Sequence, residues 1–264
     1  MPRFSANLTF LFQDLPFLDR FSAAAQAGFK GVEHQFPYDT PPADIVSRLQ
    51  ENQLEMVLIN APPGNWEAGE RGLAGLPGRE SEFKDSIGLA IDYAKALGCP
   101  RIHVMSGIPA PELPKESVMA TLVENLAWAA SQLESEGIRM LLEALNPVDV
   151  PGYLISHNQQ TRAVMAVVNH PNVFMQYDLY HAAMNGENLQ DSLMMHFEVV
   201  DHMQVAGAPG RHEPDTGNAD FFPIFEMVDT LGYEGWIGCE YAPQTSTLEG
   251  LGWASVFGLK GTSP

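Results

Sequence analysis

The sequence predicts a single (β/α)8 barrel that spans residues 1–264. Short apolar runs of strand length alternate along the chain with segments whose apolar residues recur at helical spacing, the pattern of parallel strands joined by helices. Eight such units in roughly 250 residues match the size of a closed α/β barrel. The rival is an open doubly wound sheet, which normally has a glycine-rich turn after its first strand. Residues 6–16 contain no glycine, so the barrel is the better prediction.

The expected strands are rich in Val, Ile, Leu, Met and aromatic residues, as strands buried on both faces should be. They lie at residues 4–10, 31–33, 54–60, 101–105, 139–143, 173–178, 202–205 and 236–240. Their carboxyl ends should all meet at one end of the barrel, where the active sites of such barrels lie.

The expected helices lie between these strands and carry one apolar stripe each. They are placed at about residues 16–27, 41–52, 80–97, 116–136, 160–168, from 189 onward, 222–231 and 248–255. Gly28, Gly98 and Gly137 follow three of them and suit the left-handed position at a helix end. Two long irregular loops remain, residues 61–79 and 206–220, and loops of this length in a compact domain are usually functional.

The composition excludes several classes of protein. Lys and Arg number 14 against 33 Asp and Glu, a formal charge of −19, which disfavours binding to nucleic acid and to anionic membranes. Cys99 and Cys239 form no disulfide framework or zinc motif. The start of the chain lacks the features of a signal peptide, and no apolar run reaches membrane-spanning length. We expect a cytoplasmic protein; whether it forms a homo-oligomer stays open.

Polar side chains lie where the predicted strands end. The strongest set comes from the fifth to eighth strands, which are neighbours in a barrel: Glu143, Asp178, Gln204 and Glu240. Three carboxylates and one amide oxygen form an all-oxygen site for a hard divalent cation, Mg²⁺ or Mn²⁺. Without a cation, clustered carboxylates would raise one another's pKa values. The alternative is that one or two of them merely pair with Lys or Arg at the rim of the barrel.

Five further residues are candidates for contact with a substrate. His181 follows Asp178 by three residues, so it should reach the same rim and could touch a substrate oxygen or support a metal ligand. Arg211 and Arg71 lie on the two long loops and could each grip a carboxylate, or could be solvated loop charges. Trp66 could exclude water on loop closure. His103 either lines the site or packs in the core.

Glu33 ends the second strand, where a supporting or structural role is more consistent with its position than a catalytic one. Motifs for other chemistries are absent from the sequence: it has no nucleophile elbow, phosphate-binding loop, H-E-x-x-H or zinc-spaced cysteine cluster. No lysine ends a predicted strand, which argues against Schiff-base chemistry.

Several strings resemble a known family. They are RFSANLTFLF at 3–12, FPYD at 36–39, AGERGLAGLPGRE at 68–80, LVENLAWAA at 122–130, EALNP at 143–147, QYDLYH at 176–181 and GWIGCEYAPQT at 235–245. They cover almost the whole chain, which is similar to the hydroxypyruvate isomerase family of the xylose-isomerase-like sugar isomerase/epimerase barrels.

The resemblance implies that Glu143, Asp178, Gln204 and Glu240 hold the divalent metal and that Glu143 and Glu240 act as the acid/base pair. The implied reaction interconverts hydroxypyruvate and tartronate semialdehyde (2-hydroxy-3-oxopropanoate) through an enediolate. Many relatives have histidine at the position of Gln204. Asn218 also departs from the pattern, where a glutamate is expected, and RHEPD at 211–215 resembles relatives that isomerise the four-carbon 2-oxo-tetronates.

Three alternatives remain. One is a 2-oxo-tetronate isomerase, or another isomerase or epimerase of keto-acids or ketoses. Another is a metal-dependent phosphodiesterase such as the apurinic endonucleases of this barrel class, which use several histidine ligands and a basic surface. The charge of −19 and Gln204 count against it. The third is a non-catalytic binding barrel, which would leave the acids at the strand ends unexplained.

Overall fold

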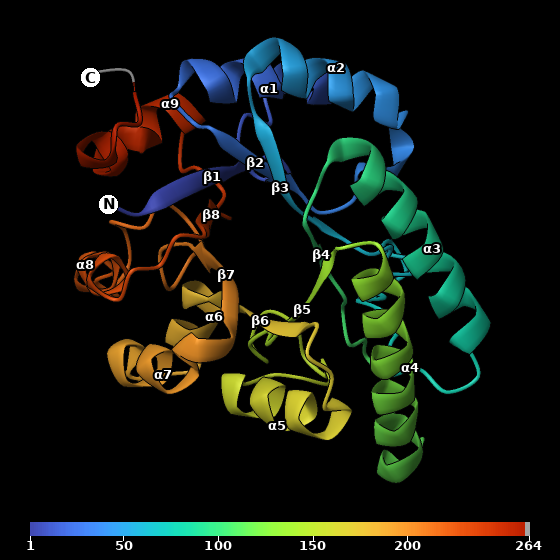
Figure 1. The fold of residues 1–264 in the computed structure, drawn as a ribbon. Helices are drawn as coiled ribbons and strands as arrows, with labels where there is room; N and C mark the ends of the chain where they lie inside the picture. The colour runs from blue at the N-terminus through green and yellow to red at the C-terminus, as the bar shows by residue number, and fades with distance from the viewer. Residues whose placement is uncertain (262–264) are drawn as a thin grey trace.

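The structure is a computed structural model that describes residues 1–261. Eight parallel strands close into one barrel in sequence order, with β8 paired to β1, and the helices surround it (Figure 1). The strands are β1 Arg3–Asn7, β2 Gly31–His34, β3 Glu55–Asn60, β4 Arg101–His103, β5 Arg139–Glu143, β6 Val173–Asp178, β7 Val200–Val205 and β8 Trp236–Cys239. The predicted (β/α)8 barrel is therefore confirmed.

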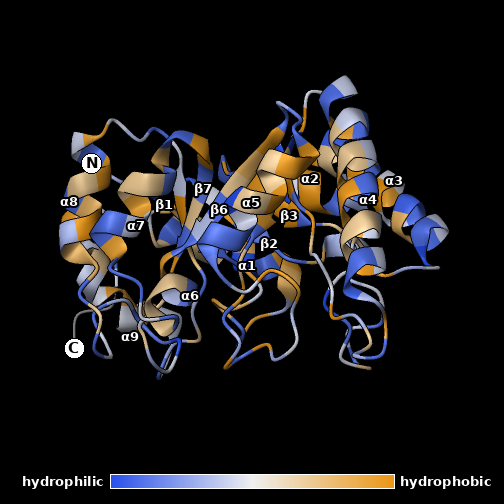
Figure 2. Ribbon diagram, turned by 90° about the horizontal axis from the view of Figure 1, so that it is seen from below, coloured by the Kyte–Doolittle hydropathy of each residue, from blue (hydrophilic) through white to orange (hydrophobic). Residues whose placement is uncertain are grey.

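The α-helices cover the outer face of the barrel (Figure 1). They are α1 Phe17–Gln26, α2 Pro42–Asn52, α3 Glu80–Leu97, α4 Lys115–Ser135, α5 Asn158–Val168, α6 Leu179–Met184, α7 Leu189–His196, α8 Phe222–Thr230 and α9 Thr247–Gly250. Each mixes hydrophobic and hydrophilic residues (Figure 2). Short 3-10 helices lie at Pro37–Asp39, Phe197–Val199 and Leu251–Phe257. No helix among residues 1–261 is long and apolar enough to cross a membrane.

Helix α3 illustrates how the sequence determines these elements. Phe83, Ile87, Ala90 and Ala94 recur at helical spacing and are all buried against the barrel. The helix ends before Gly98, which adopts φ +63°, the left-handed conformation that glycine tolerates best. The bounds found for α3 agree with those predicted from this pattern.

Several predicted bounds were wrong at the carboxyl ends of strands. β1 ends at Asn7 because the chain turns there: the Phe10 amide donates to the Asn7 carbonyl at 3.0 Å. β4 ends at His103, not at residue 105, and β8 ends at Cys239. Apolar residues continue past the ends of β1 and β4, so hydropathy alone could not locate those two ends.

Helix α6 was not predicted. It begins directly after Asp178, whose Oδ1 accepts a hydrogen bond from the Tyr180 amide at 2.7 Å. A carboxylate at this position caps the first turn of a helix. The last helix, predicted at 248–255, is divided into α9 and a 3-10 helix.

The barrel strands carry a buried polar cluster beside a separate buried apolar cluster of Val57, Leu58, Leu141 and Trp236. Buried side chains from β1, β2 and β7 meet at Glu33, which accepts hydrogen bonds from Ser5 Oγ, Asn7 Nδ2 and Gln204 Nε2 at 3.0, 3.0 and 2.8 Å. His202 Nε2 lies 2.8 Å from the same carboxylate. Barrels of this kind are more often filled by branched apolar residues. A buried polar cluster is stable only when its groups are hydrogen-bonded to one another. Through Gln204, this cluster reaches the carboxyl ends of the strands.

Candidate active site

The acids predicted at the strand ends are buried and lie at one end of the barrel. Glu143 ends β5, Asp178 ends β6, and Glu240 follows β8; their exposed fractions are 5%, 3% and 4%. Gln204, on β7, is 1% exposed. Buried carboxylates are rare without a partner of opposite charge. Four polar side chains from four successive strands are therefore brought to one buried location.

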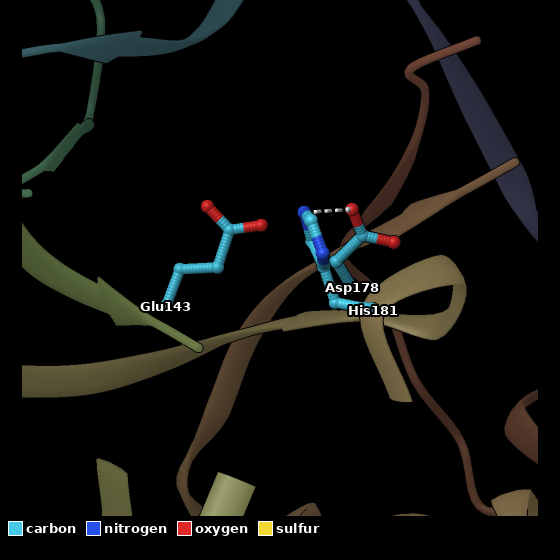
Figure 3. Close-up of side chains that lie close together, drawn as sticks. All are labelled: Glu143, Asp178 and His181. Carbon is cyan, nitrogen blue, oxygen red and sulfur yellow. Dashed lines mark ion pairs between the residues drawn. The ribbon is translucent and has the colours of Figure 1, made fainter. Parts of the chain in front are cut away.

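Glu143, Asp178 and His181 form the tightest part of this group. One oxygen or nitrogen atom from each lies within 4.8 Å of the others. Figure 3 shows the Glu143 carboxylate facing Asp178 and His181 from across the site. Glu143 Oε1 and Asp178 Oδ2 have no hydrogen-bond partner among residues 1–261. These two oxygen atoms are thus buried and available to a ligand.

The three carboxylates perturb one another. Burial, followed by the charges of Glu240 and Asp178, raises the pKa of Glu143 well above its usual range. Burial and the charge of Glu240 raise the pKa of Asp178 to about 7. The pKa of Glu240 is raised as well, mainly by burial. A cluster of this kind is poorly accommodated when all its members are ionised, unless a cation is close.

Arg211 is the one arginine close to this cluster within the described part of the chain. Its Nη2 lies 2.7 Å from Glu240 Oε2 and 3.9 Å from Asp178 Oδ2. Its guanidinium also lies over the rings of Phe10 and Tyr180, 5.1 and 5.0 Å from their centroids. Burial alone would lower the pKa of Arg211, but the surrounding carboxylates outweigh it and raise that pKa. Arg211 therefore offsets part of the negative charge.

Two amides complete the surroundings of Glu240. Gln35 Nε2 and Asn7 Nδ2 donate to its Oε1 at 2.9 and 3.2 Å. With Arg211 on the other oxygen, Glu240 is held from both sides. Gln35 was missed in the sequence because it lies two residues beyond Glu33, outside the predicted strand. A polar residue just past a strand end was the available signal.

Gln204 is oriented by its neighbours. The amide nitrogen of Gln204 donates a hydrogen bond to Glu33. The amide oxygen of Gln204 is therefore the acceptor, and it accepts from Gln176 Nε2 at 2.6 Å. Gly238 leaves room for this arrangement, since a Cβ at that position would lie 2.3 Å from Glu33 Oε1. Glu33 thus has the supporting position expected for it, and it fixes which end of the Gln204 amide is an acceptor.

His181 is fixed in one neutral tautomer. Its Nδ1 lies 3.0 Å from the backbone amide of Asn146 and 2.7 Å from Asn146 Nδ2. Both groups are N–H donors, because Asn146 Oδ1 is occupied by the amides of Val148 and Asp149. Nδ1 must therefore be unprotonated, and the hydrogen is on Nε2, 3.6 Å from Asp178 Oδ2. An Nε2–H group is a hydrogen-bond donor and cannot ligate a metal.

His103 is also buried next to the acids. Its Nδ1 lies 3.5 Å from Glu143 Oε2, beyond a good hydrogen bond, and neither ring nitrogen has a partner among residues 1–261. Burial, aided by His202, lowers its pKa to about 3, so the ring is neutral. His103 therefore lies next to the acid cluster. Its contact with a substrate remains a prediction.

The chemistry of the group fits a hard divalent cation. The donors are carboxylate oxygens and one amide oxygen, the ligands that Mg²⁺ and Mn²⁺ prefer. Two carboxylate oxygens are buried without partners, and the pKa values of all three acids are raised in the absence of a cation. Glu143, Asp178, Glu240 and the oxygen of Gln204 are the residues that could hold it. The tautomer of His181 leaves that side chain to contact another group.

A cavity of about 460 Å³ adjoins the acid cluster through Gln35 and Arg211, the two residues of its lining that contact Glu240. Phe10, Gln35, Trp66, Arg71, Tyr180 and Arg211 are among the residues that line it. It brings together both arginines and the tryptophan that the sequence suggested, which come from loops 61–79 and 206–220. Tyr180 and Phe10 were not predicted, because aromatic residues in these positions could equally belong to the core.

Known proteins resemble this chain along nearly its whole length. The family model described as "Xylose isomerase-like TIM barrel" matches residues 21–255. The 2-oxo-tetronate isomerase of Cupriavidus necator is 45% identical, covering 97% of this chain and 99% of its own. The hydroxypyruvate isomerase of Escherichia coli is 43% identical, covering 97% and 100%.

A solved structure is also similar over nearly the whole chain. The Brucella melitensis protein described as "AP endonuclease, family 2" superposes with a TM-score of 0.95 at 44% identity, covering 97% of this chain and 99% of that one. At 44% identity the two proteins are similar in sequence as well as in fold. The chain belongs to the xylose isomerase-like TIM barrel family and, within it, to the group of hydroxypyruvate and 2-oxo-tetronate isomerases.

Proposed function

We propose that the protein is a metal-assisted keto-acid isomerase that interconverts hydroxypyruvate and tartronate semialdehyde. The observation that carries the proposal is the buried carboxylate cluster of Glu143, Asp178 and Glu240, with two oxygen atoms lacking any partner among residues 1–261. Relatives at 40–45% identity are named hydroxypyruvate isomerase or 2-oxo-tetronate isomerase, which supports an isomerase of small keto-acids. A structural role does not account for unpartnered buried oxygens.

Glu143, Asp178, Glu240 and the Gln204 oxygen would hold the divalent cation. The bound cation would supply a Lewis acid, which stabilises the enediolate form of the substrate and so lowers the pKa of the carbon-bound proton that must leave. Glu33 would act behind Gln204 by fixing its amide. The same four ligands would hold either Mg²⁺ or Mn²⁺, since both cations prefer oxygen ligands.

The two glutamates would move the protons. In hydroxypyruvate, a carboxylate removes a proton from C3, the C2 carbonyl becomes part of an enediolate, and a proton is delivered to C2. The O3 hydroxyl proton passes to O2, which leaves an aldehyde at C3 and a hydroxyl group at C2. Glu143 has an oxygen with no partner, which suits proton exchange, while Glu240 is held by Arg211 and Gln35. The pair therefore offers one mobile and one firmly held carboxyl group.

His181 would donate its Nε2 hydrogen to a substrate oxygen. Its Nδ1 accepts from Asn146, and its pKa is held well below the usual range, chiefly by burial. A neutral histidine donor at the point where negative charge develops stabilises an enediolate without itself losing a proton. Asn146 is thus a positioning residue for His181.

The second candidate substrate is a 2-oxo-tetronate. The 45% identity to the Cupriavidus necator enzyme favours it as strongly as the Escherichia coli relative favours hydroxypyruvate. In both acids the reacting carbons are C2 and C3, next to the carboxylate, so the same groups could act on either. Only the extra C4 hydroxymethyl group distinguishes them.

The test is turnover of both acids by metal-stripped protein, with and without added Mg²⁺ or Mn²⁺. We expect metal-dependent turnover, and a loss of about 100-fold or more in kcat for Glu240→Gln, as typical for removal of a general base. Glu226→Gln, which changes an exposed glutamate on α8, is the matched control and should leave kcat unchanged. Turnover of Glu240→Gln close to that of the wild type would reject the assignment of Glu240.

A further inference from the structure

We propose that Arg71, supported by Trp66, is the group that receives the carboxylate of the substrate, and that Arg211 is not. The inference rests on the proposed function, because it assumes a substrate that carries a carboxylate. Both arginines line the same cavity, and nothing in the amino-acid sequence alone favours one over the other. The difference between them lies in their partners.

Arg211 is already committed to carboxylates of the protein. Its Nη2 lies 2.7 Å from Glu240 Oε2 and within ion-pair distance of Asp178. Its Nε points to the Glu240 carbonyl at 3.4 Å. Turning this guanidinium to a substrate carboxylate would remove the counter-charge from two buried acids, which is strongly unfavourable. Arg211 therefore serves the acid cluster.

Arg71 has no carboxylate partner among residues 1–261. Its Nη1 donates to the carbonyl oxygens of Trp66 and Glu70 at 3.1 and 2.8 Å, and its guanidinium stacks on the Trp66 ring, 3.6 Å from the centroid. These contacts fix the plane of the guanidinium and use only one of its three nitrogens. The Nε and Nη2 hydrogens stay available for the two parallel hydrogen bonds that a carboxylate accepts.

The nearest acid in the sequence is kept away from Arg71. Glu70 is bound by Arg79, which contacts both of its oxygens, and it also accepts from the Asn65 amide at 2.5 Å. Arg79 extends the ion pair to Glu82. Glu70 and Arg79 thus fix loop 61–79 internally and leave the charge of Arg71 uncompensated.

The acid that does line the cavity is engaged as well. Asp149 lines the cavity, and its Oδ2 accepts from Tyr180 Oη at 2.7 Å and from Asn146 Nδ2 at 3.1 Å. Arg20 is likewise half-buried without a carboxylate partner, but its Nε and Nη1 donate to the carbonyl oxygens of Leu15 and Leu8, and it does not line the cavity. Arg71 lines the cavity with two of its nitrogens free of such contacts, which suits an anionic ligand there.

The experiment compares Arg71→Met with wild-type enzyme loaded with Mg²⁺. Methionine keeps the apolar stem against Trp66 and removes the charge. Binding is measured by calorimetry with glycerate, a three-carbon acid that lacks the carbonyl and cannot isomerise, and steady-state kinetics are measured with both keto-acids. We expect Kd for glycerate and KM for both acids to rise about 10- to 100-fold, as for loss of a charge-assisted hydrogen bond. The Kd for Mg²⁺ should stay unchanged.

Three further variants sharpen the comparison. Arg71→Lys keeps the charge without the planar fork and should recover part of the affinity. Arg211→Met should change the Kd for Mg²⁺, because Arg211 contacts two of the candidate ligands. Arg48→Met, on the exposed face of α2, is the control for a lost surface charge and should change neither constant.

Normal affinity for glycerate in Arg71→Met, or no affinity for glycerate in the wild type, would overturn the inference. Loss of glycerate binding in Arg211→Met with unchanged affinity for Mg²⁺ would assign the carboxylate to Arg211 instead. Failure of the proposed function gives a different result, since wild-type enzyme would then turn over neither keto-acid whatever happens to glycerate binding.

Discussion

Replacing Asp178 with asparagine should stabilise the metal-free protein at neutral and higher pH. Burial and the charge of Glu240 raise the pKa of Asp178 from 3.8 to about 7 in the folded protein. Between these values the folded state keeps a proton that the unfolded state has lost, so the contribution of Asp178 to stability falls as the pH rises. Asparagine has nearly the same shape and no proton to lose.

The size of the effect follows from the shift. Each pKa unit corresponds to about 1.4 kcal/mol, so a shift of about three units gives a ceiling on the order of 4 kcal/mol in the free energy of unfolding. Glu143 would add to it with the same sign, because its pKa is raised partly by the charge of Asp178. Buried His34, His103 and His181, whose pKa values are lowered, act with the opposite sign below about pH 6.5. These histidines are the same in both proteins, so most of their contribution cancels when the two free energies of unfolding are subtracted.

The assay is urea unfolding of wild type and Asp178→Asn in a chelator, from about pH 4.5 to about pH 8. The stability of the variant relative to the wild type should increase steadily through this range and level off near its upper end. Mg²⁺ at about 100 times its Kd should then add about 2.7 kcal/mol to the wild type and much less to the variant, which narrows the difference between the two proteins at pH 8. A difference between the two proteins that does not change with pH would refute the account of the acid cluster.

Two other substitutions probe the supporting residues. Asn146→Ala removes one of the two donors to His181 Nδ1, so nitrogen NMR of labelled histidine should show a mixture of tautomers, and kcat should fall about 10-fold with little change in KM. An unchanged Nε2–H signal would contradict the role given to Asn146. Gly238→Ala places a Cβ 2.3 Å from Glu33 Oε1 and should lower the free energy of unfolding by about 2 kcal/mol or more; wild-type stability would show that Glu33 is not held as described.

The fold could be predicted from the sequence because eight apolar runs alternate with amphipathic segments. The bounds of β5, β6 and α3 were predicted correctly, since a polar residue or glycine marks each carboxyl end. Helix α6 was missed because it is initiated by Asp178, a residue that the sequence pattern marked only as the end of a strand. Local capping and not periodicity determines that helix.

The site was predictable only in part, and the reason is physical. Residues at the ends of parallel strands converge by topology, so Glu143, Asp178, Gln204 and Glu240 could be named together. Which partner each side chain finds depends on packing among distant segments. The commitment of Arg211 to Glu240 joins two loops, and the tautomer of His181 depends on Asn146, 35 residues earlier in the chain. No local pattern carries that information.

The most direct test of the central claim is to follow hydroxypyruvate by proton NMR in heavy water with metal-stripped protein, before and after addition of Mg²⁺. We expect no turnover without the cation and, after its addition, loss of the C3 proton signal of hydroxypyruvate with formation of tartronate semialdehyde. Turnover without any divalent cation, or no turnover after Mg²⁺ is added, would contradict metal-assisted isomerisation by the buried acids.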